Sequence, residues 1–226
     1  VKKRVPVVAG TGSNETAYAV ELTKYAAKVG ADAALVVTPY YNKCTQNGLV
    51  RHYTKIADEA GLPLILYAVP SRTGVTIKTE TYAKLAKHPK IVAVKEASGD
   101  LSAILKLRHA CGDDLNVYSG NDDQIVPMMA LGAKGVISVL SNIMPAKTVE
   151  MCDRWFAGDA AGAAALQKEL LPLMNALFCE VNPIPVKAAL AMMGMIEESY
   201  RMPLCPMAEQ TRARVERAMR GAGLLG

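Results

Sequence analysis

Residues 90–97 read KIVAVKEA, and they give the clearest indication of the fold. Four apolar residues precede Lys95, and a nearly continuous apolar run is typical of a strand in a parallel sheet whose two faces are both covered. A lysine in such a strand is costly to keep charged. The stretch therefore predicts a buried strand that ends in an unusual amine.

Outward from this stretch, five similar runs recur along the chain. They are residues 5–10 (VPVVAG), 32–39 (DAALVVTP), 63–69 (PLILYAV), 115–120 (LNVYSG) and 133–140 (AKGVISVL). Between them lie segments with apolar residues at helical spacing, such as residues 16–31. This alternation predicts about six βα units, and from about Pro145 the pattern becomes helical only.

Two architectures fit this alternation, a doubly wound open sheet and a (β/α)8 barrel. Gly10 and Gly12 follow the first strand, but Glu15 stands where a dinucleotide-binding loop requires glycine. Polar residues recur instead at the carboxyl ends of the strands, where barrels carry their chemistry. We therefore predict an α/β fold of the (β/α)8 TIM-barrel type with about six βα units and a C-terminal helical tail. Residues 1–144 are predicted to form an incomplete barrel with the active site, and residues 145–226 the last barrel helix and a helical region.

The composition excludes several classes of function. The 226 residues are 51% hydrophobic and 21% charged, as in an ordinary globular protein, and the net charge of +5 comes from scattered Lys and Arg with only two Phe and one Trp to stack on bases. No apolar run approaches the ~18–20 residues of a membrane span. Five cysteines form no C-x-x-C pair, and the three histidines lack metal-ligand spacing. We expect a cytoplasmic protein that binds neither nucleic acid nor membrane and needs no metal or organic cofactor.

Lys95 is the first candidate for chemistry. Desolvation would lower the pKa of its ammonium and leave a neutral amine that can attack a carbonyl to form a Schiff base. The alternative is a structural ion pair with Glu96. Adjacent strand residues face opposite sides, which makes that pair geometrically poor.

Tyr67, Arg72 and the pair Tyr40 and Tyr41 follow neighbouring strands. Tyr67 could relay protons beside Lys95, or it could be a core tyrosine whose hydroxyl reaches the surface. Arg72 suits a bidentate grip on a carboxylate, but it could equally be a solvated loop arginine. At most one of the two adjacent tyrosines should face its own site, and the other could pack or cross an interface.

The motifs VTPYYNK, LYAVPSRTG, VKEASGD, YSGNDD, GVISV and NPIPVKAAL resemble those of the 4-hydroxy-tetrahydrodipicolinate (dihydrodipicolinate) synthase family of pyruvate-dependent class I aldolases. The resemblance implies that Lys95 forms an imine with pyruvate and that Tyr67 relays protons. It implies that Arg72 binds the carboxylate of L-aspartate 4-semialdehyde and that Tyr41 reaches into the site of a partner subunit. Gly120 and Ile137 match positions that line the pyruvate pocket, and Asn14 and Tyr40 match an effector site. The activity implied belongs to lysine and diaminopimelate biosynthesis, in a homo-oligomer, dimer or tetramer.

Two alternatives stay open. Similar N-acetylneuraminate lyases and 2-keto-3-deoxy sugar acid aldolases keep the lysine and the tyrosine, but they generally lack the arginine of SRTG. Arg72 therefore favours a short acidic aldehyde. The other alternative is an inactive paralogue that keeps the fold for binding or assembly. It rests on a departure from the family, because the 226 residues hold no G-T-T-G-E-S-like loop, which the family carries at the end of the second of two additional N-terminal βα units. We therefore expect an N-terminally shortened member or a fragment, whose activity the missing loop would impair.

Overall fold

A parallel five-stranded sheet forms the centre of the first of two compact units in the computed structural model, which describes all 226 residues. The first unit comprises residues 1–120 and 127–136, and the second comprises residues 121–126 and 137–226. The strands are β1 (Val8–Gly10), β2 (Ala33–Val37), β3 (Leu64–Ala68), β4 (Ile91–Glu96) and β5 (Asn116–Ser119), paired in that order. Each lies inside a predicted run. The predicted parallel α/β class is confirmed.

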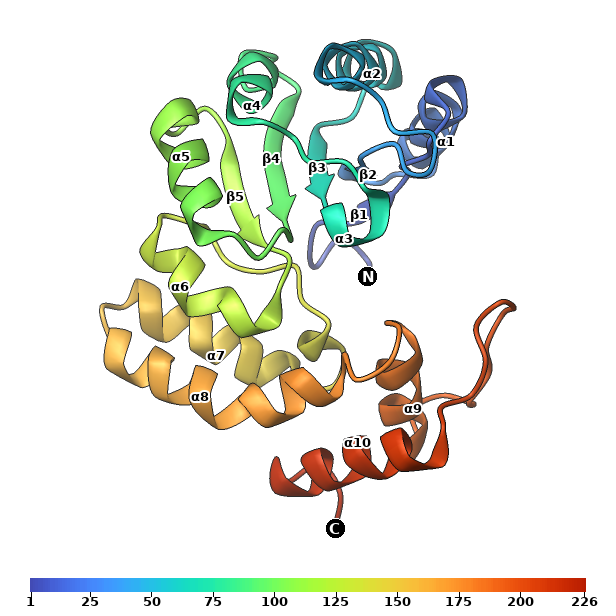
Figure 1. The fold of residues 1–226 in the computed structure, drawn as a ribbon, viewed down its shortest axis with the longest axis vertical. Coiled ribbons are helices and arrows are strands. Elements are labelled where there is room, and N and C mark those ends of the chain that lie inside the picture. Colours follow the sequence, from blue (N-terminus) through green and yellow to red (C-terminus); the bar gives the residue numbers. More distant parts are fainter. The chain divides into compact units, whose positions relative to one another are not determined.

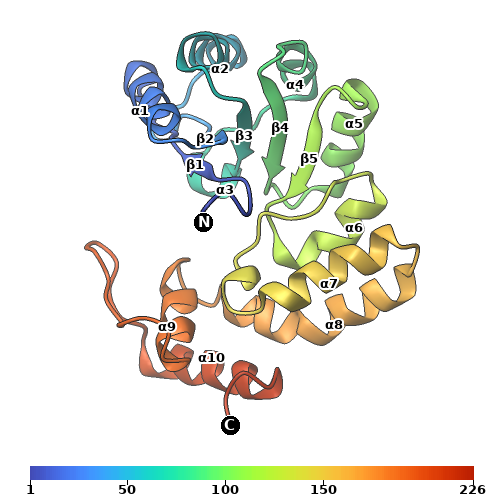
Figure 2. The ribbon, with the colours of Figure 1, turned by 180° about the vertical axis from the view of Figure 1, so that it is seen from behind.

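Helices follow each strand: α1 (Thr16–Lys28), α2 (Gln46–Ala60), the short α3 (Pro70–Thr73), α4 (Thr79–Leu85), α5 (Leu101–Cys111) and α6 (Ile125–Ala130). Of these, α1, α2, α4 and α5 cover one face of this sheet, and the short α3 lies at the carboxyl end of β3 (Figures 1 and 2). Side-chain caps start three of them: Glu15 at α1, Thr45 at α2 and Asp100 at α5 each accept backbone N–H bonds of the first turn. Gly61 ends α2 in the left-handed conformation, at φ 79°.

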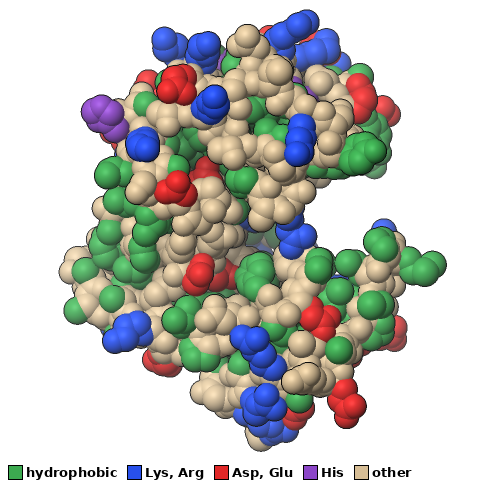
Figure 3. All heavy atoms as spheres, viewed as in Figure 1, with side chains coloured by type: hydrophobic (Ala, Val, Ile, Leu, Met, Phe, Trp, Pro, Cys, Tyr) green, Lys and Arg blue, Asp and Glu red, His purple; other side chains and the backbone are tan.

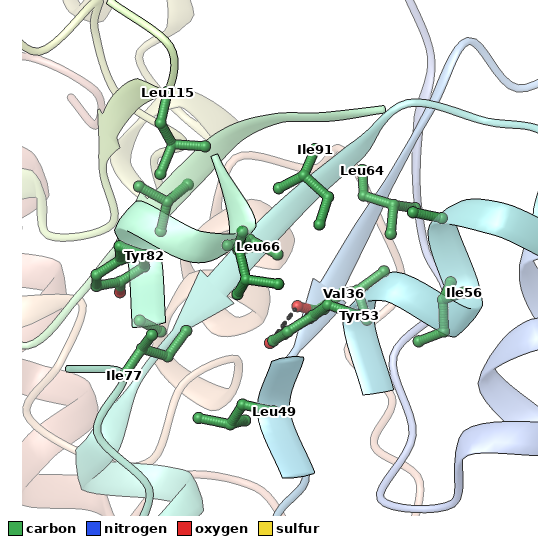
Figure 4. Close-up of a cluster of buried hydrophobic side chains, with 14 of the residues drawn as sticks. Val36, Leu49, Tyr53, Ile56, Leu64, Leu66, Ile77, Tyr82, Ile91 and Leu115 are labelled. Carbon is green, nitrogen blue, oxygen red and sulfur yellow. Dashed lines mark hydrogen bonds between the residues drawn. The ribbon is translucent and has the colours of Figure 1, made fainter. Parts of the chain in front are cut away.

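The core of the first unit lies between the sheet and these helices. Figure 4 shows aliphatic side chains of β2, β3 and β4 packed against α2 and α4. Tyr53 is fully buried among them, and its hydroxyl donates to the carbonyl of Val36 at 3.2 Å, which satisfies the phenol inside an apolar cluster.

The predicted sixth strand, residues 133–140, is present only as an isolated bridge beside β5. Val136 pairs with Ser119, the N–H of Lys134 donates to the carbonyl of Val117 at 2.8 Å, and the N–H of Ser119 donates to the carbonyl of Gly135 at 2.8 Å. The residues that follow turn into a short 3-10 helix, Leu140–Asn142. The N–H groups of Val139 and Leu140 donate instead to the carboxylate of Asp122, at 3.0 and 2.8 Å. These groups are therefore not available for a strand ladder.

The second unit is helical from Pro145 onward, as the pattern predicted. Its helices are α7 (Pro145–Phe156), α8 (Ala160–Ala176), α9 (Ile184–Met192) and α10 (Glu209–Gly221). Gln167 of α8 is buried and clasps the turn at residues 122–126, donating to the carbonyl of Asp122 and accepting from the N–H of Val126. No helix of the chain is long and apolar enough to cross a bilayer. The predicted division at residue 144 stays a prediction.

Candidate active site

Lys95 and Tyr67 lie side by side at the carboxyl ends of β4 and β3. The two residues are register partners in the parallel ladder, so their side chains share a face of the sheet. The Nζ of Lys95 lies 4.4 Å from the centre of the Tyr67 ring, and both residues are half-buried. The structure thus brings together an amine and a phenol, the two groups that the sequence singled out.

Glu96 faces the opposite side of β4. It is only 6% exposed, and its carboxylate accepts from the Tyr82 hydroxyl at 2.7 Å and from the N–H of Ser98 at 2.8 Å. These two donors belong to α4 and to the turn after β4. The carboxylate is thereby satisfied away from the face that carries Lys95.

A pocket of about 420 Å³ adjoins Tyr67. Its lining residues come from the ends of β1, β2 and β3 and the loops after them: Gly10, Gly12, Leu35, Val37, Tyr40, Tyr67, Val69, Arg72 and Thr73. A Cβ atom at Gly12 would lie 2.5 Å from the backbone nitrogen of Val37, so only glycine fits there. A larger surface hollow of about 610 Å³ along α2 contains none of the predicted site residues.

Arg72 reaches this pocket from the short helix α3. The helix ends at Gly74, whose φ of 68° suits glycine, and Thr73 anchors it by donating to the Val69 carbonyl and accepting from the Thr38 hydroxyl at 3.0 Å. Burial raises the pKa of Tyr67, while the charge of Arg72 opposes that shift. A neutral phenol beside a guanidinium can donate a hydrogen bond or a proton to a bound anion.

Gly120 closes the other side of Lys95. Its N–H donates to the carbonyl of Glu96 at 2.8 Å, which carries the β4–β5 pairing one residue beyond Ser119. A Cβ at Gly120 would lie 2.6 Å from the Cβ of Ala97 and 3.2 Å from the Cε of Lys95. The absent side chain leaves the room that the lysine occupies.

The two adjacent tyrosines of the loop after β2 have different surroundings. Tyr40, which was predicted for an effector site, lines the pocket with Tyr67 and Arg72. Tyr41 is 90% exposed and has a φ of 68°, a strained conformation for a tyrosine. Asn14, the other predicted effector residue, accepts a bond from the Asn42 side chain on its backbone carbonyl at 3.1 Å.

Ile137 is half-buried and belongs to the second unit. Its role, like the roles of the other predicted site residues, stays a prediction. Thr73 and Gly12 were not predicted from the sequence as pocket-lining residues. The SRTG motif and the glycine after the first strand were the signals that could have indicated them.

The chain brings an amine, a phenol and a guanidinium together at one edge of a barrel-type parallel sheet. A half-buried lysine meets a tyrosine at the carboxyl ends of adjacent strands, where such folds carry their chemistry, and an arginine stands beside the pocket. No group of three His, Cys, Asp or Glu side chains is placed to hold a metal ion, and all five cysteines are free thiols.

Comparison with known proteins gives the family. The profile of the dihydrodipicolinate synthetase family matches residues 1–222, so the chain belongs to that family. The 4-hydroxy-tetrahydrodipicolinate synthase of Thermodesulfovibrio yellowstonii is 53% identical over 225 residues, covering 100% of this chain and 77% of that protein. The enzyme of the same name from Geobacter sulfurreducens is 54% identical over 97% of this chain and 76% of its own.

A solved structure agrees with this assignment. The chloride-inhibited dihydrodipicolinate synthase of Acinetobacter baumannii, complexed with pyruvate, superposes with a TM-score of 0.97 at 49% identity over 99% of this chain and 77% of that one. The predicted family and the barrel-type fold, present here in part, are confirmed. The predicted class of enzyme, a lyase homologous to 4-hydroxy-tetrahydrodipicolinate synthase, is also confirmed.

Proposed function

We propose that the chain condenses pyruvate with L-aspartate 4-semialdehyde through an imine on Lys95. The observation that carries the proposal is the contact of the Lys95 Nζ with the Tyr67 ring, 4.4 Å from its centre, at the carboxyl ends of β4 and β3. The amine attacks the keto carbon of pyruvate, and loss of water gives the imine. Loss of a methyl proton then gives an enamine, whose carbon attacks the aldehyde. The amino group of the second substrate displaces Lys95 and closes the ring of 4-hydroxy-tetrahydrodipicolinate.

Tyr67 is the proton relay in this series of reaction steps. Its raised pKa keeps the phenol neutral, so it can donate a proton when water leaves the carbinolamine and accept one from the next step. Its ring also covers the amine, which limits access of water to the imine.

Arg72 selects the second substrate. Its guanidinium lines the pocket beside Tyr67, and a planar fork of donors binds a carboxylate with two parallel hydrogen bonds. A sugar acid would need several neutral partners for its hydroxyls. We assign Arg72 to the carboxylate of the semialdehyde, and Gly120 and Ile137 to the pyruvate site.

Tyr41 reaches into the site of a partner subunit. Its ring is 90% exposed and its backbone is held at φ 68°. Strain of this kind persists where the surrounding structure fixes it, often at functional sites. A second copy of the chain would cover this ring, and Asn14 and Tyr40 would lie near the same loop as an effector site.

A condensation assay on the chain tests the proposal. The parent is expected to consume pyruvate and L-aspartate 4-semialdehyde together, and Lys95→Ala to show no turnover. Lys84→Ala, at an exposed position of α4, is the control for loss of a lysine and should behave as the parent. Cleavage of N-acetylneuraminate or a 2-keto-3-deoxy sugar acid, without condensation, would overturn the proposal.

A further inference from the structure

Arg72 is carried by a helix that is too short to hold itself in place. Helix α3 has four residues, begins at Pro70 without a side-chain cap, and buries only Thr73. Isolated helices of fewer than about 12 residues are marginal in water, so a single turn needs contacts from the rest of the fold. The position of Arg72 therefore depends on what holds Thr73.

The hydroxyl of Thr73 is the group by which α3 is held. It donates to the carbonyl of Val69 at 3.2 Å and accepts the N–H of Val75 at 3.2 Å, so it joins the residues on either side of the helix. It also accepts the hydroxyl of Thr38, which follows β2, at 3.0 Å. Thr38 is 0% exposed and Thr73 is 4% exposed, so water does not compete for this bond.

Thr38 connects the helix of Arg72 with the proposed relay tyrosine. Its N–H donates to the carbonyl of Tyr67 at 3.1 Å, which extends the pairing of β2 with β3 by one residue. Its side chain bonds Thr73, the neighbour of Arg72 in the sequence. Thr38 does not itself line the pocket. It therefore acts on the pocket only through the groups that it holds.

The segment that follows α3 has anchors of its own. The side chain of Gln46, in the first turn of α2, donates to the carbonyl of Thr76 at 2.9 Å. Its amide oxygen accepts the N–H of Lys78 at 3.0 Å and the hydroxyl of Thr81 at 2.7 Å. Loss of the Thr38 hydroxyl should therefore loosen α3 and leave the rest of the loop in place.

We propose that Thr38 is a positioning residue that orients Arg72 for the carboxylate of the second substrate, through the buried hydroxyl pair Thr38–Thr73. This inference rests on the proposed function. A guanidinium binds a carboxylate through two parallel hydrogen bonds only when the two planar groups are aligned. The apparent affinity falls in proportion to the fraction of molecules that hold the aligned orientation, and the hydroxyl pair keeps that fraction high.

The test removes one hydroxyl. Thr38→Val keeps the branched shape, and the Thr73 hydroxyl keeps its bonds to Val69 and Val75, so it does not become a buried group without a partner. The KM for L-aspartate 4-semialdehyde is expected to rise about threefold to tenfold, the effect of losing one neutral hydrogen bond. The KM for pyruvate and the kcat at saturating semialdehyde should change little, because the bound carboxylate itself orders Arg72.

Three further variants separate positioning from stability. Thr38→Ser keeps the hydroxyl and loses a methyl group, so it should lower the melting temperature and keep the parent KM. Thr23→Val is the matched control, because the Thr23 hydroxyl donates to the Thr11 hydroxyl at 2.8 Å in a second buried pair. It should lower the melting temperature and leave both KM values unchanged. Thr38→Val combined with Arg72→Ala should show the KM of Arg72→Ala alone, because Thr38 acts through Arg72.

An unchanged KM for the semialdehyde in folded Thr38→Val would overturn the inference and leave the proposed function intact. An equal rise in Thr23→Val, or a rise that persists in full beside Arg72→Ala, would do the same. A parent that traps no pyruvate at Lys95 would overturn the proposed function itself.

If Thr38→Val does not fold, Thr38→Ser and Thr38→Ala are compared, since they differ only by the hydroxyl. The same rise in the KM for the semialdehyde is then expected from serine to alanine. Equal KM values in these two variants are as decisive against the inference as an unchanged Thr38→Val.

Discussion

The centre of the sheet and its β1 end are built from similar apolar residues, yet they differ in what covers them. At the centre, β3 and β4 each have two neighbouring strands, and the side chains around Tyr67 and Lys95 are held by ladders on both sides. At the other end, β1 pairs with β2 alone, and Val8 is 43% exposed. Tyr25 of α1 and Val29, which follows its last turn, are also exposed, and Figure 3 shows hydrophobic side chains gathered near that helix.

The central strands hold their own side chains in place, whereas the β1 end is open to a further strand or helix. The contact between lysine and tyrosine depends on residues of the central strands only. The apolar surface of β1 and α1 is of the kind that native proteins cover with another strand or helix, because an open edge invites pairing with other chains.

The largest effect is expected at the β1 end. Placing the N-terminal segment of the Geobacter sulfurreducens relative ahead of Val1 should raise turnover with pyruvate and the semialdehyde by ~10²–10⁴-fold, because general acid–base groups typically contribute that much. The added relay hydroxyl is expected in a G-T-T-G-E-S-like loop. Steady-state assays of the 226-residue chain and the fused chain measure the ratio of their turnover rates.

The control replaces the hydroxyls of that loop with alanine in the fused chain. It should fold as the fused chain does but lose most of the gain. Equal turnover of the 226-residue chain and the fused chain would show that the central strands alone supply the full site.

The next largest effect is expected on the free energy of unfolding at acid pH, through a histidine between α1 and α2. His52 of α2 is buried, and its Nδ1 lies 2.9 Å from the Thr16 hydroxyl. Burial lowers the pKa of His52 from 6.5 to about 4, against the opposing charge of Glu15. The native state therefore binds this proton more weakly than the unfolded chain does. The stability it contributes is complete above about pH 6.5 and is lost as pH falls toward 4, by at most about 3 kcal/mol.

Urea unfolding at pH 7 and pH 4.5 checks this sign. His52→Gln should lose less stability on acidification than the parent does. His88→Gln, whose ring contacts Asp58 near the surface, is the matched control and should keep the parent's sensitivity. An equal loss in parent and His52→Gln would contradict the assignment.

Arg72 gives a smaller, more selective effect at the pocket. Arg72→Ala should raise the KM for the semialdehyde about tenfold to a hundredfold, because loss of a charged hydrogen-bonding partner costs ~1.5–3 kcal/mol. The KM for pyruvate should change little. Arg51→Ala, at an exposed position of α2, removes the same charge elsewhere and should change neither value. Equal effects of Arg72→Ala on both substrates would remove Arg72 from its proposed role.

The smallest effect compares one glycine in each region. Gly120→Ala should destabilise the chain by ~1–3 kcal/mol, because the new methyl group meets Ala97 and Lys95 in a packed site. Gly10→Ala, at the end of β1, has nothing within 4 Å of the new Cβ and should stay within ~0.5 kcal/mol of the parent. Equal unfolding free energies of the two variants, measured in urea, would show that the two regions are packed alike.

The sequence predicted the five strands and the lysine because both depend on local pattern. An apolar run marks a strand covered on both faces, and Lys95 stands out by breaking such a run. The sixth run pairs with β5 only around Val136, and at its end the Asp122 carboxylate, distant in sequence, accepts the N–H groups of Val139 and Leu140. No local pattern shows that contact.

The site was predictable in part for the same reason. Residues that end neighbouring parallel strands must meet at one edge of the sheet, so Tyr67 and Lys95 could be paired from their positions alone. Pocket residues such as Thr73 depend on how a loop folds back onto the adjacent strand end, here through the Thr38 hydroxyl. The placement of Tyr40 beside Tyr67 and Arg72 likewise came only with the structure.

Whether Lys95 forms the imine with pyruvate is decided by the location of the reduced pyruvate adduct. The chain is incubated with ¹³C-labelled pyruvate and borohydride, digested, and mapped by mass spectrometry. We expect a single labelled peptide with the added mass on Lys95, and no labelled peptide from Lys95→Ala. Label spread over exposed lysines such as Lys84, or label that persists in Lys95→Ala, would contradict this assignment.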